Sequence, residues 1–223
     1  MNTRSITQLA DDLSSAKSAD EFHAALRRAL GSYDQLNVSK VEAAGVKLVC
    51  RAGCSLCCWL RVDVYAPEVF IIAETLRKEL APQELEALQV RLAEHAELVT
   101  RLTVLEHATR NLACPLSVDG WCSVYSVRPH TCRRHHSQDL AACQFTYEHP
   151  EDLEFPGAHS RELFGDLTEA MGLHAAVYEY FGFDTTVYEL GSALEEALGD
   201  AACWRRWSRK KKAFRRASVT PSG

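Results

Sequence analysis

Cysteine distribution is the feature that most constrains this chain of 223 residues, because eight of its nine cysteines lie between positions 50 and 143. They are Cys50, Cys54, Cys57, Cys58, Cys114, Cys122, Cys132, Cys143 and Cys203. The count is odd, and a chain of 24.9 kDa can bury a core large enough to fold without disulfide bonds. We therefore interpret the cluster as metal or redox chemistry rather than as a disulfide framework.

The expected compartment agrees with this interpretation. The first residues lack the apolar central segment of a secretory signal. The most apolar run, residues 62–73, contains Asp63 and Glu68 and is too short to cross a bilayer. We expect a cytoplasmic protein without a membrane span, whose thiols stay reduced. The net charge of −5 gives no general reason to expect nucleic acid as a partner.

Hydrophobic periodicity outside the cysteine stretches predicts a mainly α-helical fold. Residues 1–48 are expected to be helical, with a capping box at Ser18 and Glu21, a helix end at Gly31 and a second short helix over residues 34–44. Further helices are expected over residues 68–80, from residue 82 as far as residue 112, over residues 158–181 and over residues 187–198.

The chain divides into three parts that we expect to form one domain. Residues 1–48 are the N-terminal helices, residues 49–150 are a cysteine-cluster core with intervening long helices, and residues 151–223 are C-terminal helices and a basic tail. The helical period disappears between residues 114 and 150, and a structureless connection of that length usually has a function. We expect a loop-dominated metal site there, ordered by the metal itself.

The first cysteine stretch has the spacing C-x3-C-x2-C-C from Cys50 to Cys58. On a helix or a tight turn, separations of three and four residues place side chains on one side, and Gly53 allows a sharp turn before Cys54. Thiolates at that spacing repel one another unless a cation or a cluster absorbs their charge. Zinc and iron–sulfur clusters both take four ligands of this kind. The spacing indicates a metal without identifying it.

The second stretch contains Cys114, Cys122, Cys132 and Cys143, at spacings that match no common zinc finger. These spacings fit loops that converge on a site whose other half is the first stretch. Two further sets of side chains lie in this stretch and are candidates to offset thiolate charge, or to replace or orient a cysteine: Arg128, Arg133 and Arg134, and His130, His135 and His136. The alternative for the histidines is exposure in loops.

Several other groups are interpreted as structural. Cys203 stands alone and is expected to be an ordinary buried cysteine. Asp63, Glu68 and Asp119 are expected to be solvated carboxylates, and His107 a surface or boundary residue. No nucleophile elbow, phosphate loop or His-Glu-x-x-His helix is present in the sequence.

The basic tail, residues 204–216, carries eight positive charges with Trp204, Trp207 and Phe214 interleaved. Such a pattern fits contact with nucleic acid, and it fits equally a terminal helix that docks through its aromatic side chains. We favour docking, since the sequence shows no second basic region.

The order of these motifs resembles the YkgJ-type cysteine-cluster family, which is described as zinc- or iron-chelating. The resemblance covers roughly residues 45–145 and is carried by C-x3-C-x2-C-C from Cys50, by Cys114-Pro115-Leu116, and by Gly120-x-Cys122-Ser123-Val124-Tyr125-x2-Arg128-Pro129-x2-Cys132-Arg133. It is similar also to the flagellin lysine N-methylase group, which is associated with an iron–sulfur cluster. The resemblance implies that the cysteines are ligands. It does not extend to a glycine-rich methyl-donor turn, which this chain lacks.

Three functions remain open on the sequence. The first is a metal-binding protein that holds an iron–sulfur cluster or zinc on cysteines 50–143, for storage, delivery or electron transfer. The second is a cluster-dependent protein-modifying enzyme resembling the lysine N-methylases, with a pocket lined by Arg128, His130 and Arg133. The third is a structural zinc domain whose helical face binds a protein partner. We favour iron–sulfur over zinc, and eight cysteines leave one centre or two open.

Overall fold

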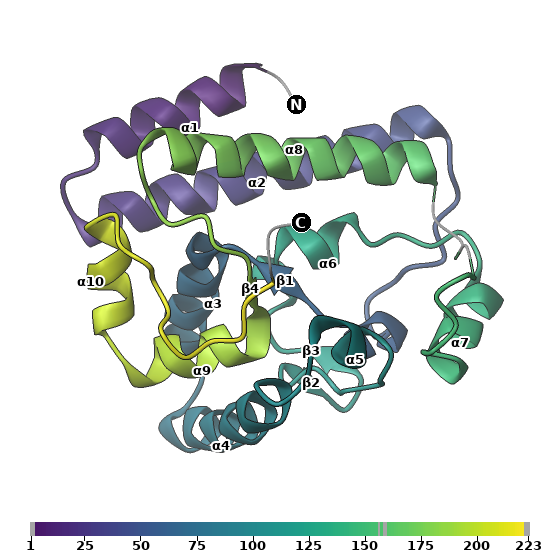
Figure 1. The fold of residues 1–223 in the computed structure, drawn as a ribbon. Coiled ribbons are helices and arrows are strands. Elements are labelled where there is room, and N and C mark those ends of the chain that lie inside the picture. The colour runs from purple at the N-terminus through teal and green to yellow at the C-terminus, as the bar shows by residue number, and fades with distance from the viewer. Residues whose placement is uncertain (1–2, 156, 158–159, 221–223) are drawn as a thin grey trace.

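Three long helices form one side of the molecule. The computed structural model describes residues 3–155, 157 and 160–220. In it, α1 (Thr3–Ser15) packs against α2 (Ala19–Ala44), and α8 (Arg161–Tyr180) lies across both of them (Figure 1). These helices bury Leu26, Leu167 and the Tyr33 ring, whose hydroxyl donates to the Leu167 carbonyl at 3.1 Å. This layer closes the core from one side.

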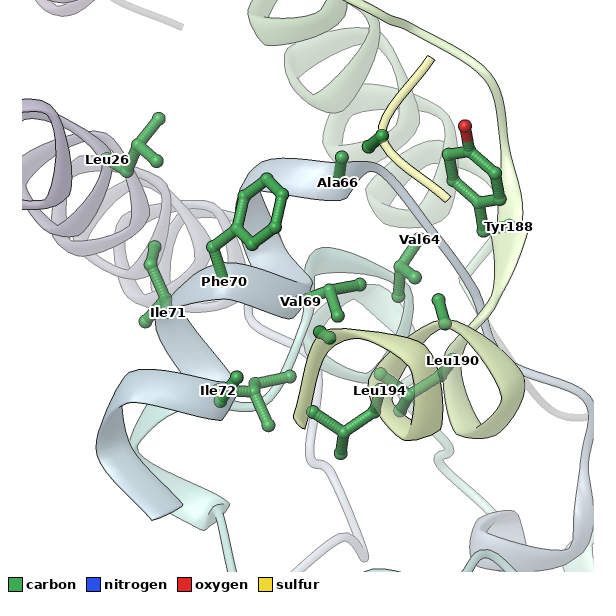
Figure 2. Packing of buried hydrophobic residues seen from close by; sticks show 14 of the residues in the cluster. Leu26, Val64, Ala66, Val69, Phe70, Ile71, Ile72, Tyr188, Leu190 and Leu194 are labelled. Carbon is green, nitrogen blue, oxygen red and sulfur yellow. The ribbon is translucent and has the colours of Figure 1, made fainter. Parts of the chain in front are cut away.

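The centre of the core lies between α3 (Ala66–Glu79) and α9 (Leu190–Gly199), with α4 (Pro82–Val99) packed on the other side of α9. Val69 and Ile72 of α3 meet Leu194 of α9 in Figure 2, and all three are buried. Burying one such side chain stabilises the fold by roughly 1.5–3 kcal/mol. The apolar run that is too short for a membrane is therefore the central core helix. None of the described helices is long and apolar enough to cross a membrane.

Short elements connect the helices and carry most of the cysteines. Four of them are strands that form two antiparallel pairs. In the first pair β1 (Asp63–Val64) lies beside β4 (Tyr188–Glu189), and in the second β2 (Ser117–Val118) lies beside β3 (Trp121–Cys122). The hairpin turn uses positive φ angles of 51° at Asp119 and 78° at Gly120, as tight hairpins require. The remaining short elements are η1 (Leu56–Trp59), α5 (Val104–Ala108), η2 (Tyr125–Val127), α6 (His130–Arg134), α7 (Leu140–Glu148) and α10 (Ala202–Ser208).

The predicted helix end at Gly31 is wrong, and so is the separate helix over residues 34–44. The helix α2 continues through Gly31 from its capping box at Ser18 and Glu21, which is confirmed, to Gly45 at φ 61°. Leu30 and Tyr33 on either side of Gly31 are buried against neighbouring elements. Their burial holds the helix together where the local propensity of glycine opposes it.

Alanine at position 31 is expected to stabilise the protein by about 0.5–1 kcal/mol. No atom lies within 4 Å of the position that a Cβ at Gly31 would take, so the substitution improves helix propensity without a clash. Gly45→Ala is the matched control, because Gly45 has equal space but a left-handed φ of 61°. Urea unfolding should show a higher midpoint for Gly31→Ala and a lower midpoint for Gly45→Ala. A lower midpoint for Gly31→Ala would contradict the assignment.

Two other helices differ from their predicted bounds. The helix from Pro82 stops at Val99 instead of reaching residue 112, and α5 begins anew where the Thr103 hydroxyl accepts the Glu106 N–H at 3.1 Å. The helix expected over residues 187–198 begins after β4, where the Glu189 carboxylate caps its first N–H groups. The expected start of the 158–181 helix lies partly outside the described residues, and α8 is described from Arg161.

The basic tail folds back onto α9. The Glu196 carboxylate, 2% exposed, accepts the backbone N–H groups of Arg215, Arg216 and Ala217, and the Arg206 guanidinium pairs with it at 2.9 Å. Trp207 and Phe214 are fully buried. These two aromatic side chains are therefore part of the core and are not available to stack on bases.

Candidate metal centre

The two cysteine stretches meet where η1, the β2–β3 hairpin, η2 and α6 come together. Cys57 and Cys58 lie on η1, Cys122 on β3, and Cys132 on α6. The backbone joins the two stretches directly, because the Cys114 N–H donates to the Cys58 carbonyl at 2.7 Å. All eight cysteines of residues 50–143 are free thiols, as is Cys203.

Four cysteines, Cys58, Cys114, Cys122 and Cys132, form a group that we call the inner quartet. Each of these thiols lies within electrostatic range of the other three, and Cys57 lies in range of Cys58 and Cys132. The quartet lines one cavity together with Cys54, Cys57 and apolar side chains such as Leu116 and Val124. The cavity holds about 60 Å³, far less than the roughly 300–1,000 Å³ of pockets for organic ligands. Its size and lining suit a small inorganic group.

Burial strongly affects the ionisation of these thiols. It raises the pKa of Cys114 to about 12 and also raises the pKa of Cys132. Cys58 differs, because a hydrogen bond from the Cys57 thiol, assisted by Ser117 and Arg128, lowers the pKa of Cys58 to about 7 against the effect of burial. Buried thiols of this kind ionise together only when a cation compensates their charge, and a coordinating metal deprotonates them outright.

Hydrogen-bond donors point at the sulfur atoms of the inner quartet. The Leu116 N–H is bonded to the Cys114 sulfur, the Val124 N–H to the Cys122 sulfur and the Ser117 side chain to the Cys58 sulfur, and each bond favours the thiolate. The first two donors lie two residues after the cysteine, so the local turn supplies them. Hydrogen bonds to ligand sulfurs orient metal ligands and set cluster potentials.

Arg128 supplies positive charge at the same cavity. Its guanidinium lies 4.3 Å from the centroid of the Tyr125 ring and lowers the pKa of both Cys122 and Cys132 against the larger effect of burial. Its Nε atom is buried and has no hydrogen-bond partner within the part of the chain that the structure describes. An unpaired cationic donor beside four thiols fits a bound group that carries negative charge.

The other two arginines do not take the expected role. Arg133 is buried and donates to the carbonyls of Arg128 and Ser126, at 2.6 and 2.7 Å, while pairing with Asp34 of α2. It therefore fixes the loop that presents Arg128. Arg134 points to α8, where its guanidinium covers the Phe164 ring at 4.5 Å. Of the three predicted arginines, Arg128 is the one that lines the cavity.

His130 and His136 are buried, so the alternative of exposed loop histidines is wrong for them. His130 Nδ1 lies 2.8 Å from a Glu68 carboxylate oxygen, and its Nε2 lies 3.3 Å from His174. With both ring nitrogens engaged, His130 supports the fold near Cys132 and does not reach the cavity. His136 contacts Asn37 at 3.0 Å, and His135 lies beside a second cavity, near Cys143.

Glu68 is the important residue that sequence reasoning misjudged, since it is 6% exposed and not solvated. Burial opposes its ionisation, but His130 and two backbone N–H groups keep the pKa of Glu68 lowered. One of these N–H groups belongs to His130, so Glu68 holds the first residue of α6, the helix that carries Cys132. A carboxylate inside an apolar run was the signal that could have identified it.

Four more predictions concern single residues. Asp63 is ion-paired with Arg61 at 3.0 Å, and His107, expected at the surface, is buried against the same guanidinium at 3.1 Å. Asp119 forms the hairpin turn. Cys203 is buried away from the cluster, near Glu196. His107 departs from expectation because it packs against Arg61, which is distant in sequence, whereas Cys203 is buried as expected.

His174 makes stability depend on pH. Burial, assisted by the neighbouring His130, lowers the pKa of His174 to about 3, whereas an unfolded histidine titrates near about 6.5. Below that pH the unfolded chain binds a proton that the folded protein does not. The free energy of unfolding therefore falls as pH drops from the unfolded pKa towards the folded one, by up to about 1.4 kcal/mol per pH unit.

The variant His174→Gln, which has no titrating ring, is expected to show a shallower loss of unfolding free energy than the wild type between about pH 6.5 and 5. Urea unfolding of both proteins at several pH values measures the slope. Parallel slopes would mean that His174 is not held neutral by the fold.

The remaining four cysteines, Cys50, Cys54, Cys57 and Cys143, form a second group that we call the outer quartet. Cys50 is exposed and lies within electrostatic range of Cys54 and Cys143, and Cys57 lies within range of Cys50. The Ser137 N–H donates to the Cys50 sulfur at 3.2 Å. The structure therefore brings all eight predicted cysteines to one region, in which Cys57 connects the outer cysteines with the inner quartet.

No family model, curated protein or solved structure matches the chain. The chemistry of the site is therefore argued from its own residues.

Proposed function

We propose that the protein holds an iron–sulfur cluster of the 4Fe–4S type on the inner quartet and uses it for electron transfer. The observation that carries the proposal is the meeting of six cysteines, the inner quartet among them, in one small cavity with the unpaired Nε of Arg128. Such a cluster takes four cysteine ligands. It would gain one electron from a reduced donor protein and pass it to an oxidised acceptor, with no bond to the cysteines made or broken.

The spacing of the sulfur atoms supports iron–sulfur over zinc. A tetrahedral zinc with bonds of about 2.3 Å brings its four sulfurs within about 4 Å of one another. Among the described residues, no three cysteine sulfurs all lie within 4.8 Å of each other. A cubane cluster separates its ligand sulfurs further, because each sulfur binds a different iron atom.

One other group of side chains does meet this 4.8 Å limit, but a neighbouring arginine supplies the positive charge that a metal would supply. Potential ligand atoms of Glu196, Asp200 and Cys203 lie within 4.8 Å of one another. The Arg206 guanidinium donates to all three side chains. The positive charge there is thus already supplied by the protein, so we assign no metal to this group.

The residues around the inner cavity support an electron carrier over a modification enzyme. Of the three residues expected to line a catalytic pocket, His130 and Arg133 are buried in hydrogen bonds away from the cavity, and Arg128 lines it. Four cysteines satisfy a 4Fe–4S cluster without an open coordination position. The resemblance to the YkgJ-type family implies that the cysteines are ligands, without singling out these four.

Protein isolated without oxygen tests the proposal directly. Iron and acid-labile sulfide in equal amounts, together with a broad visible absorption that bleaches on reduction with dithionite, are the expected results. Zinc without iron or sulfide would overturn the proposal in favour of a structural zinc domain. Neither metal after anaerobic reconstitution would also overturn it.

Arg128 provides an additional prediction about the reduction potential. Reduction adds negative charge to the cluster, and the Arg128 guanidinium stabilises that charge. Arg128→Gln is therefore expected to make the potential more negative, whereas Arg128→Lys should remain closer to the wild type because it keeps the charge. A dye-coupled potential titration measures both variants. Equal potentials in all three proteins would show that Arg128 does not act on the cluster.

A further inference from the structure

The two faces of the β2–β3 hairpin differ in their chemistry. In the strand register Ser117 lies opposite Cys122, and Val118 lies opposite Trp121. Because neighbours along a strand point to opposite faces, the first pair faces one way and the second pair the other. Cys122 lines the inner cavity, and the Ser117 side chain is bonded to the Cys58 sulfur. One face of the hairpin therefore serves the cysteines, and the other carries Val118 and Trp121.

Three large apolar side chains are exposed next to the inner cavity, and we call them the outer hairpin face. Val118 is 45% exposed, Trp121 61% and Tyr125 45%. Tyr125 lines the cavity, and so does Gly53, on which the Trp121 ring rests. A Cβ on Gly53 would lie 3.2 Å from that ring. Apolar side chains that are exposed together, rather than singly, mark a site of interaction.

We propose that the outer hairpin face is the docking surface for a protein electron carrier that presents an apolar surface around its own redox group. This inference rests on the proposed function of the inner quartet. The redox group of the carrier gives one electron to the oxidised cluster, or takes one from the reduced cluster, and no bond is made or broken. Trp121 directly precedes Cys122 in the chain, so a carrier that covers Trp121 lies next to a ligand of the cluster.

The wall between this face and the cavity is thin, because two glycines form part of it. Gly53 and Gly120 both line the cavity, and their φ angles are 82° and 78°. A left-handed backbone of this kind favours glycine, which has no side chain to lengthen the path to the cavity. Since electron transfer slows steeply with distance, this is a favourable side from which a carrier can approach.

The size of the face fits a transient protein partner better than other occupants. Stable interfaces bury about 1,200–2,000 Å² with about 20–30 residues on each side, whereas electron-transfer encounters bury less. Three exposed side chains match the smaller class. An organic carrier has no pocket in the adjoining cavity, which holds about 60 Å³ against roughly 300–1,000 Å³ for such ligands.

The charges beside the face nearly balance. Arg51, in the same turn as Gly53, and Asp119, in the hairpin turn, are both exposed and opposite in sign. Apolar contact is therefore expected to dominate the docking, and the rate of electron transfer should depend little on salt.

Electron transfer from the dithionite-reduced protein to two oxidised acceptors tests the inference. Azurin, a blue-copper protein with an apolar surface beside its copper, is the protein probe, and ferricyanide is a small probe that needs no docking face. Val118→Asp places a charge in the face and should lower the rate with azurin about tenfold. Trp121→Ser should lower it at least as much, because aromatic anchors dominate such interfaces. Tyr180→Ser, which removes an 84% exposed ring from α8, is the matched control and should react as the wild type.

The outcomes separate this inference from the proposed function. Ferricyanide rates, iron content and reduction potential should stay close to those of the wild type in Val118→Asp, which changes a residue outside the cavity lining. Should Trp121→Ser lose iron because its ring supports Gly53, Val118→Asp alone decides. Equal azurin rates in the wild type and Val118→Asp would overturn the docking face and leave the cluster standing. A parallel fall of the azurin and ferricyanide rates would also overturn it. Absence of iron from the wild type would instead refute the proposed function itself.

Discussion

Cys132→Ser is expected to lose the inner cluster and to lower the free energy of unfolding by on the order of 5 kcal/mol, as loss of a structural metal does. Cys132 reaches the cavity from α6, whereas Cys58, Cys114 and Cys122 come from other elements. Without its thiolate the proposed cluster would have three protein ligands, and the loops that it would join would lose their common attachment. Iron analysis and thermal unfolding followed by circular dichroism measure the two effects.

Cys203→Ser provides the control for this prediction. Cys203 is more buried than the quartet residues and lies beside α9, where Arg206 Nη2 is 3.1 Å from its sulfur. A serine hydroxyl can accept the same hydrogen bond, so iron content should be unchanged and stability only slightly reduced. If Cys132→Ser kept full iron and the wild-type melting temperature, Cys132 would not be a ligand.

The second large effect is expected at Glu68, where Glu68→Ala should cost about 3–5 kcal/mol of unfolding free energy. The carboxylate accepts the Tyr65 N–H at 2.9 Å, the His130 N–H at 2.8 Å and the His130 ring at 2.8 Å. Alanine leaves these buried donors without a partner, and each unsatisfied group carries a desolvation penalty of about 1–3 kcal/mol. Urea unfolding measures the change.

Glu68→Gln is the matched variant, because glutamine keeps one oxygen acceptor and nearly the same volume. It should lose less stability than Glu68→Ala. Because Glu68 holds the first residue of α6, both variants are also expected to retain less iron than the wild type, in the same order. A loss below about 1 kcal/mol for Glu68→Ala, which is typical of an ordinary surface site, would show that the carboxylate is not a buried anchor.

Helix content could be predicted because it depends on neighbours in sequence. The capping box at Ser18 and the end at Gly45 are local signals, and both are confirmed. Gly31 misled the prediction because the burial of Leu30 and Tyr33, which keeps α2 continuous, depends on contacts with distant elements. The break after Val99 was missed for a related reason, since the apolar period continues beyond it although the helix does not.

The candidate site could be predicted in its membership but not in its arrangement. The cysteine spacing predicted eight candidate ligands, and seven of them line two cavities that share Cys57. The sequence also suggested that three arginines offset thiolate charge. In the structure Arg133 donates to a loop carbonyl, Arg134 covers the Phe164 ring of α8, and Arg128 lines the cavity. Which side of a short helix faces a site depends on what the helix packs against.

By itself, the sequence determined that the chain is mainly helical and that eight of its nine cysteines are concentrated between positions 50 and 143, because helical periodicity and thiol spacing are both local properties. Only the tertiary structure decided which of these thiols line the inner cavity. It also decided that Glu68 is a buried anchor. The physical reason is that a thiol's partners and a carboxylate's burial are set by elements that lie far apart in the chain and meet only when the core between α3 and α9 forms.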